Sequence, residues 1–98
     1  MNKKIGVIDI QIKMICAASR VLLFLKHHPK AIDEEIFQDL SDYIAFERIK
    51  DEKIIRGMMA AASKTLAVKR KQFSNSDKLI LREVIELISP IALEINTQ

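Results

Sequence analysis

Apolar residues recur at helical spacing along four stretches of the chain, and this period is the clearest structural signal in the sequence. Residues 32–48, 52–72 and 77–88 each carry an apolar stripe between charged positions. The chain contains only two Gly and two Pro, too few for an all-β protein with a turn at roughly every 8–12 residues. We therefore expect an all-α protein in which each stretch buries one face. In residues 32–48 that face consists of Ile32, Ile36, Phe37, Leu40, Tyr43 and Ile44.

The first stretch, residues 5–28, is apolar around most of its circumference. Four of its charged or polar positions fall on one narrow stripe of a helical wheel, and most of the rest is aliphatic or aromatic. Such a helix must be covered on most sides, so we expect it to be either the central helix of a bundle or part of a subunit interface. Pro29 ends it, because the residue before a proline disfavours helical backbone angles. The polar stripe consists of Asp9, Lys13, Arg20 and His27.

Short connections between the four stretches predict antiparallel neighbours. We therefore expect a compact antiparallel four-helix bundle, formed as a single domain by all 98 residues. Asp51 stands where it would cap the third helix, and Asp33 is the candidate cap of the second. Gly57 lies close to alanines, where small residues would let two helices approach closely. Ser89 and Pro90 either kink the fourth helix or start a short fifth helix at the C-terminus.

Charge is segregated along the chain, whereas a small domain without a dedicated surface usually mixes both signs. Residues 31–47 contain six carboxylates and no Lys or Arg, which gives this segment a charge of −6. The flanking residues 1–30 and 48–82 carry +5 and +7, and residues 83–98 carry −3. The overall charge of +3 is modest, so the separation of the signs, more than their sum, indicates a binding function.

The acidic segment places an outward stripe of carboxylates and one phenylalanine on the second predicted helix, opposite its apolar face. An aromatic ring on the polar side has no evident role in folding. The carboxylates would steer a basic protein partner toward this side, and the phenylalanine would serve as an apolar anchor. The plain alternative is a solvated helix face that binds nothing. The candidate partner-binding residues are Glu34, Glu35, Gln38, Asp39, Asp42 and Phe46.

A rival surface lies on the outer side of the third predicted helix, where Lys and Arg gather toward the C-terminal end. Such a cluster suits contacts with the phosphates of a nucleic acid. The support is limited, because no helix-turn-helix pattern or aromatic platform accompanies it, and the acidic stripe would repel a polyanion. The candidate nucleic-acid contacts are Lys64, Lys69, Arg70 and Lys71.

The chain contains almost no recognisable catalytic or metal-binding motif, so we expect no enzymatic activity, no cofactor and no metal. His27 and His28 are the only histidines, and neither follows a carboxylate at the spacing of helical di-metal sites. Cys16 is the only cysteine, which is typical of a reducing compartment. The uninterrupted apolar runs are too short for a membrane span. We therefore expect a cytoplasmic protein.

These observations leave three hypotheses. The first is a small non-catalytic module that docks a basic protein through the acidic stripe, most concretely a bacterial immunity or antitoxin protein that neutralises a basic toxin. The second is a nucleic-acid-associated protein or transcriptional regulator that uses the basic side of the third helix. The third is a homodimeric structural subunit that pairs through the apolar first helix.

Overall fold

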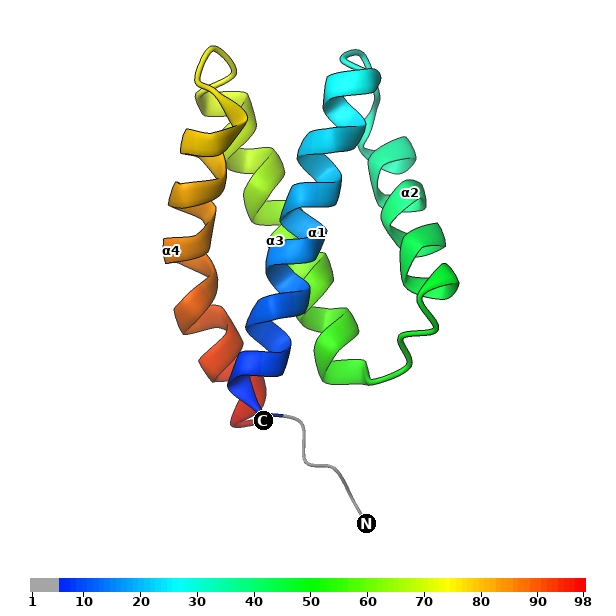
Figure 1. Cartoon of the computed structure of the whole chain (residues 1–98), viewed down its shortest axis with the longest axis vertical. Coiled ribbons are helices and arrows are strands. Elements are labelled where there is room, and N and C mark those ends of the chain that lie inside the picture. Colours follow the sequence, from blue (N-terminus) through cyan, green and yellow to red (C-terminus); the bar gives the residue numbers. More distant parts are fainter. Residues whose placement is uncertain (1–5) are drawn as a thin grey trace.

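Four helices, joined by short connections, make up the fold in a computed structural model that describes residues 6–98. Consecutive helices run in opposite directions (Figure 1), so the antiparallel four-helix bundle predicted from the sequence is confirmed. No strand occurs within the described residues. The helices are α1 (Val7–His27), α2 (Asp33–Phe46), α3 (Glu52–Lys71) and α4 (Asp77–Asn96).

Helix α1 is the central element of the bundle. It packs against all three other helices, while α2 rests mainly on α1, contacts α3 only slightly and does not touch α4. Figure 1 shows α2 on one side of α1 and α4 on the other, with α3 crossing behind α1. The expectation of a central first helix is therefore confirmed. Part of its surface nevertheless stays uncovered, because Ile8 is 67% and Ile12 is 53% exposed.

The close packing of α1 against α3 depends on Gly57. A β-carbon at this position would lie 2.9 Å from Cγ2 of Ile10 and 3.1 Å from Cγ of Met14. Separations this short are repulsive, so any side chain here would push the two helices apart. The predicted role of this small residue in close helix approach is confirmed.

The N-termini of α2 and α3 begin in different ways. Asp51 caps α3 as predicted, because its Oδ1 accepts a hydrogen bond of 3.0 Å from the backbone N–H of Ile54. Asp33 does not cap α2, so that prediction is wrong. Instead the helix begins after Ile32, whose backbone N–H donates to Oε1 of Glu35 at 3.0 Å. A carboxylate one turn inside the helix thus satisfies the backbone N–H of the N-cap residue, which is one half of a capping box.

Helix α4 continues through Pro90 to Asn96 without a break, so there is no separate fifth helix in the described chain. The expected end near residue 88 is wrong. Pro90 removes the N–H that would bond to the carbonyl of Glu86, and both residues are exposed, so water can hydrate that carbonyl. Beyond the proline, the buried Ala92 and Ile95 hold the last turns of the helix against the bundle.

Candidate protein-binding surface

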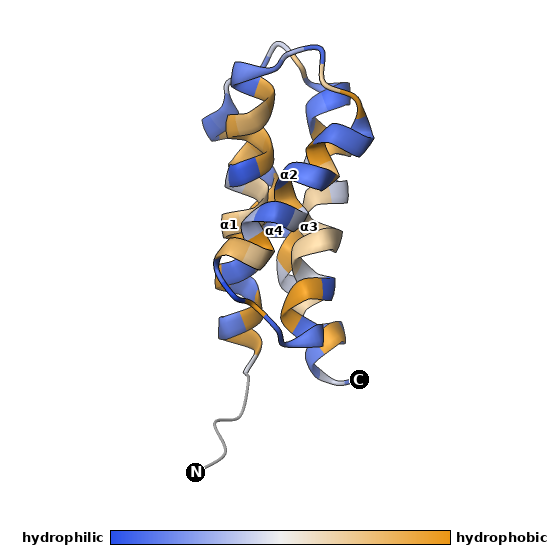
Figure 2. Ribbon diagram, turned by 90° about the vertical axis from the view of Figure 1, so that its right-hand side faces the viewer, coloured by the Kyte–Doolittle hydropathy of each residue, from blue (hydrophilic) through white to orange (hydrophobic). Residues whose placement is uncertain are grey.

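The outward side of α2 carries the six residues singled out from the sequence, Glu34, Glu35, Gln38, Asp39, Asp42 and Phe46, which we call the acidic face. Its position follows from the opposite side of the helix, where Ile36, Leu40 and Ile44 are buried. Helical periodicity then directs the residues between them away from the core. Figure 2, in which α2 lies nearest the viewer, shows that its outer surface is largely hydrophilic.

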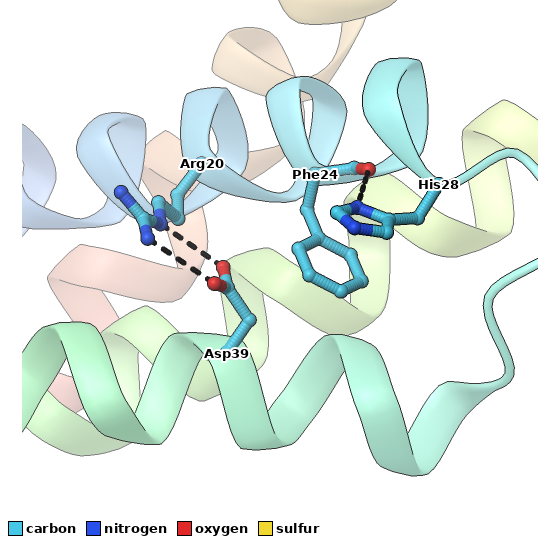
Figure 3. Close-up of polar contacts among 4 residues, drawn as sticks. All are labelled: Arg20, Phe24, His28 and Asp39. Carbon is cyan, nitrogen blue, oxygen red and sulfur yellow. Dashed lines mark hydrogen bonds and ion pairs between the residues drawn. The ribbon is translucent and has the colours of Figure 1, made fainter.

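Asp39 differs from the other members of the acidic face because it forms an ion pair with α1. Nε and Nη2 of Arg20 donate to the two carboxylate oxygens of Asp39 at 3.0 Å and 3.1 Å (Figure 3). Only 17% of the Asp39 side chain remains exposed. Asp39 therefore lies at the partly buried edge of the acidic face. A two-point pair of this kind fixes both side chains and joins α2 to α1.

Arg20 also compensates part of the negative charge that the sequence of α2 leaves unbalanced. By accepting hydrogen bonds from the guanidinium, the Asp39 carboxylate raises the pKa of Arg20 above its ordinary value. The guanidinium carbon lies 5.1 Å from the ring centroid of Tyr43, within range of a cation–π interaction. Like-charge repulsion within α2 is thus relieved by a cation from another helix, which the sequence of α2 alone does not contain.

The remaining polar members of the acidic face are exposed to solvent. Glu35 has the capping role described above, and Nε2 of Gln38 donates to Oδ1 of Asp42 at 2.9 Å. The Glu34 side chain forms no hydrogen bond or ion pair with the described residues. Each ionised carboxylate has about four lone-pair sites, so one internal contact leaves Glu35 and Asp42 able to accept further hydrogen bonds. The acidic face is therefore partly preorganised and still open to a partner.

A shallow hollow of 450 Å³ lies on this face between α2 and the C-terminal part of α1. Phe24 of α1 is its aromatic element, and all the other lining residues belong to the acidic face. The Phe24 ring stacks on the imidazole of His28, with ring centroids 4.4 Å apart, and Figure 3 shows the two rings side by side. The residues that line the hollow with Phe24 are Glu34, Glu35, Gln38, Asp39 and Asp42.

Sequence reasoning placed five of these residues correctly on one surface but missed Phe24. A signal for it was present, because Phe24 lies one helical turn after Arg20, on the edge of the polar stripe of the first helix. Phe46 is 82% exposed, as expected from its place on the polar side, but it does not line the hollow. It lies at the last position of α2 and forms a separate apolar point on the acidic face.

The four candidate nucleic-acid contacts do not behave as one free basic cluster. Lys69 forms an ion pair of 3.1 Å with Asp77 of α4, and Arg70 forms one with Asp33 of α2. Lys64 and Lys71 are exposed and have no carboxylate partner among residues 6–98. Both ion pairs join the end of α3 to a neighbouring helix, so two of the four cations have a local role in the fold.

No group of three or more His, Cys, Asp or Glu side chains in the described part of the chain is arranged to hold a metal ion. Over the same residues, no helix has both the length and the apolar composition needed to cross a membrane. A scan against protein-family models, a search of curated proteins and a search of solved structures each find no match to this chain.

Proposed function

We propose that this chain is a small non-catalytic protein-binding module that docks a basic partner protein through the acidic face of α2. The observation that supports this most directly is the hollow of 450 Å³, which is lined by one aromatic ring and four carboxylates, of which only Asp39 is paired with a cation among residues 6–98. A Lys or Arg side chain from a partner fits this composition. Its aliphatic stem packs on Phe24 while its charged head meets the carboxylates.

The charge distribution favours rapid recognition of such a partner. Residues 31–47 carry a charge of −6 in a chain whose overall charge is +3. A concentrated negative surface of this kind steers a basic protein toward one helix and disfavours acidic competitors. Phe46 supplies an exposed aromatic anchor that becomes desolvated in the complex, as aromatic residues do at the energetic centres of interfaces.

The internal contacts of the acidic face support the same proposal. Arg20 fixes Asp39, and stacking on His28 restrains Phe24. Side chains that are already ordered lose less conformational entropy when a partner binds. The most concrete form of the proposal is a bacterial immunity or antitoxin protein that neutralises a basic toxin in the cytoplasm, where the lone Cys16 stays reduced.

A homodimer is the second candidate, because one specific surface favours it. Ile8 and Ile12 of α1 and Ile85 of α4 are exposed and line a groove of 220 Å³ between these helices. A second copy would cover this apolar surface. The nucleic-acid hypothesis is weaker, because Asp77 and Asp33 lie beside Lys69 and Arg70 and the acidic face would repel a polyanion.

The docking proposal is tested with a helical Lys- and Arg-rich peptide as the basic probe. Its affinity is measured by isothermal titration calorimetry for the original chain and for a Glu34→Lys, Asp42→Lys double variant. We expect the double variant to lose at least about tenfold in affinity. The matched control is Glu86→Lys, Glu94→Lys, which makes the same change in net charge at two exposed positions of α4.

The control should bind the peptide nearly as well as the original chain, and circular dichroism should show unchanged helicity in both variants. An equal loss of affinity in the two double variants would mean that net charge alone determines the affinity. That result would contradict a specific docking face. Absence of saturable peptide binding to the original chain would also overturn the proposal.

A further inference from the structure

A second hollow lies at the end of the bundle where α1 and α3 end and where α2 and α4 begin, at the top of Figure 1. Its volume is 570 Å³, within the range of about 300–1,000 Å³ typical of small-molecule sites. It shares no lining residue with the hollow on the acidic face. We call it the end pocket.

The wall of the end pocket is mainly aliphatic. Leu22 and Leu25 of α1, Ile36 of α2 and Leu66 of α3 meet here, so the pocket reaches the edge of the hydrophobic core. Phe73, in the connection between α3 and α4, also lines it and is 76% exposed. An exposed aromatic ring beside an apolar pocket gains contacts when an apolar ligand covers it.

The polar groups of the end pocket are mostly cationic. Lys26, Lys69 and Arg70 contribute three positive charges, and Asp77 is the one carboxylate among the lining residues. Two of these cations are already paired, Lys69 with Asp77 and Arg70 with Asp33. Lys26 has no carboxylate within 4.0 Å among residues 6–98. The balance, with both aspartates counted, is one uncompensated positive charge.

We propose that the end pocket binds an aliphatic carboxylate, with the hydrocarbon chain against the leucines and Phe73 and the carboxylate at Lys26. A single uncompensated charge suits a monovalent anion better than a polyphosphate. Small inorganic anions would gain no affinity from the apolar wall. Burial of the hydrocarbon chain would provide most of the affinity, and Lys26 would select the charged head.

The two ion pairs at the pocket are compatible with this proposal. Arg70 and Asp33 are both at least half exposed, and Lys69 and Asp77 are partly exposed. Exposed ion pairs contribute little to stability, so either cation can turn toward a bound carboxylate at small cost. Three cations that the sequence linked to nucleic acid, or left unassigned, thus become the polar rim of one small-molecule site.

The test is a titration of the full chain with dodecanoate below its micelle concentration, followed by calorimetry and by NMR of the leucine methyl groups. We expect saturable binding of one ligand per chain, with shifts at Leu25 and Leu66. Dodecanol, which lacks the charge, should bind more weakly. Ala31→Phe, which fills the pocket from the α1–α2 connection, and Lys26→Glu should each weaken binding by about tenfold or more.

The matched controls are Ala67→Phe and Lys64→Glu, two exposed positions on α3 that do not line the pocket. They should bind dodecanoate like the original chain, and all four variants should keep their helical circular dichroism. No saturable binding, equal binding of dodecanol, or the same loss in variants and controls would overturn the proposal. Binding to anionic vesicles without binding to dodecanoate would also overturn it.

The outcome is independent of the function proposed for the acidic face. Ala31→Phe changes no residue that lines the acidic hollow, so it should still bind the basic peptide. The Glu34→Lys, Asp42→Lys variant should still bind dodecanoate, because neither residue lines the end pocket. Failure of one proposal therefore does not imply failure of the other.

Discussion

Helices α2 and α3 differ in how much of their surface they bury in the bundle. Helix α3 buries eight of its 20 residues between its neighbours, whereas α2 buries three of its 14. Because α2 rests mainly on α1, most of its surface stays free for recognition. The difference indicates a division of labour, in which α1, α3 and α4 supply most of the stability and α2 presents most of the acidic surface.

This division implies that α2 can open while the other three helices stay folded. Local opening requires less free energy where fewer apolar contacts are lost. The fully buried side chains of α2 are Ile36, Leu40 and Ile44. Phe37 and Tyr43 pack against the core while partly exposed, and the Arg20–Asp39 and Arg70–Asp33 ion pairs add to the attachment. Three experiments test this difference between α2 and the rest of the bundle.

The largest effect is expected from a matched pair of cavity substitutions, Leu40→Ala in α2 and Ile80→Ala in α4. Both side chains are fully buried, and α2 and α4 do not touch. Each substitution should lower the free energy of unfolding by about 3 kcal/mol in urea denaturation. Amide hydrogen exchange then distinguishes the two substitutions. Ile80→Ala should speed exchange in α3 but leave α2 unchanged, because the opened state of α2 still contains the Ile80 contacts.

Leu40→Ala should instead speed exchange in both α2 and α3, because it destabilises the native state relative to every opened state. If Ile80→Ala accelerates exchange in α2 as much as in α3, the four helices open as a single unit. The division between a stable core and a separable α2 would then be wrong.

A smaller effect is expected at the ion pair that joins α2 to α1. In a double-mutant cycle with Arg20→Met and Asp39→Asn, the coupling energy should be about 0.5–1 kcal/mol, since two-point geometry strengthens a pair that is only partly buried. Urea denaturation of the four proteins measures it. A coupling energy indistinguishable from zero would mean that apolar contacts alone hold α2 in place.

Most of the fold could be predicted from the sequence, because the helical spacing of apolar residues is a local property of each segment. The stripe through Ile36, Leu40 and Ile44 defined the buried side of α2, and the first three helices appear close to their expected ranges. The errors lie where tertiary packing decides. Helix α4 passes Pro90 because Ala92 and Ile95 still bury their side chains beyond it.

The candidate site was only partly predictable for the same reason. Helical spacing identified the acidic face, but nothing in the sequence of α2 showed that Asp39 would meet Arg20, 19 positions earlier. The end pocket is even harder to predict from the sequence, because its lining residues come from all four helices and two of their connections. Leu22 and Asp77, for example, line the same pocket only after the chain has folded.

The smallest effect concerns Tyr43, which reports on the docking of α2 without disturbing it. Burial raises the pKa of the Tyr43 phenol above its ordinary value of 10.0, with further contributions from Cys16 and Glu47. The Arg20 guanidinium opposes this rise, because it stabilises the phenolate. A raised pKa in the folded state means that the neutral phenol stabilises the fold below the ordinary pKa. That contribution is lost as the pH rises through the folded value.

Tyr43 is the only tyrosine and the chain has no tryptophan, so phenolate absorbance follows this one group. We expect its titration midpoint above the ordinary value in the original chain, and higher still in Arg20→Met, where the opposing cation is gone. Tyr43→Phe should lessen the loss of stability at alkaline pH. A midpoint at the ordinary value under folding conditions would mean that Tyr43 lies in water. Helix α2 would then spend much of its time away from α1, and the acidic face would form only when a partner binds.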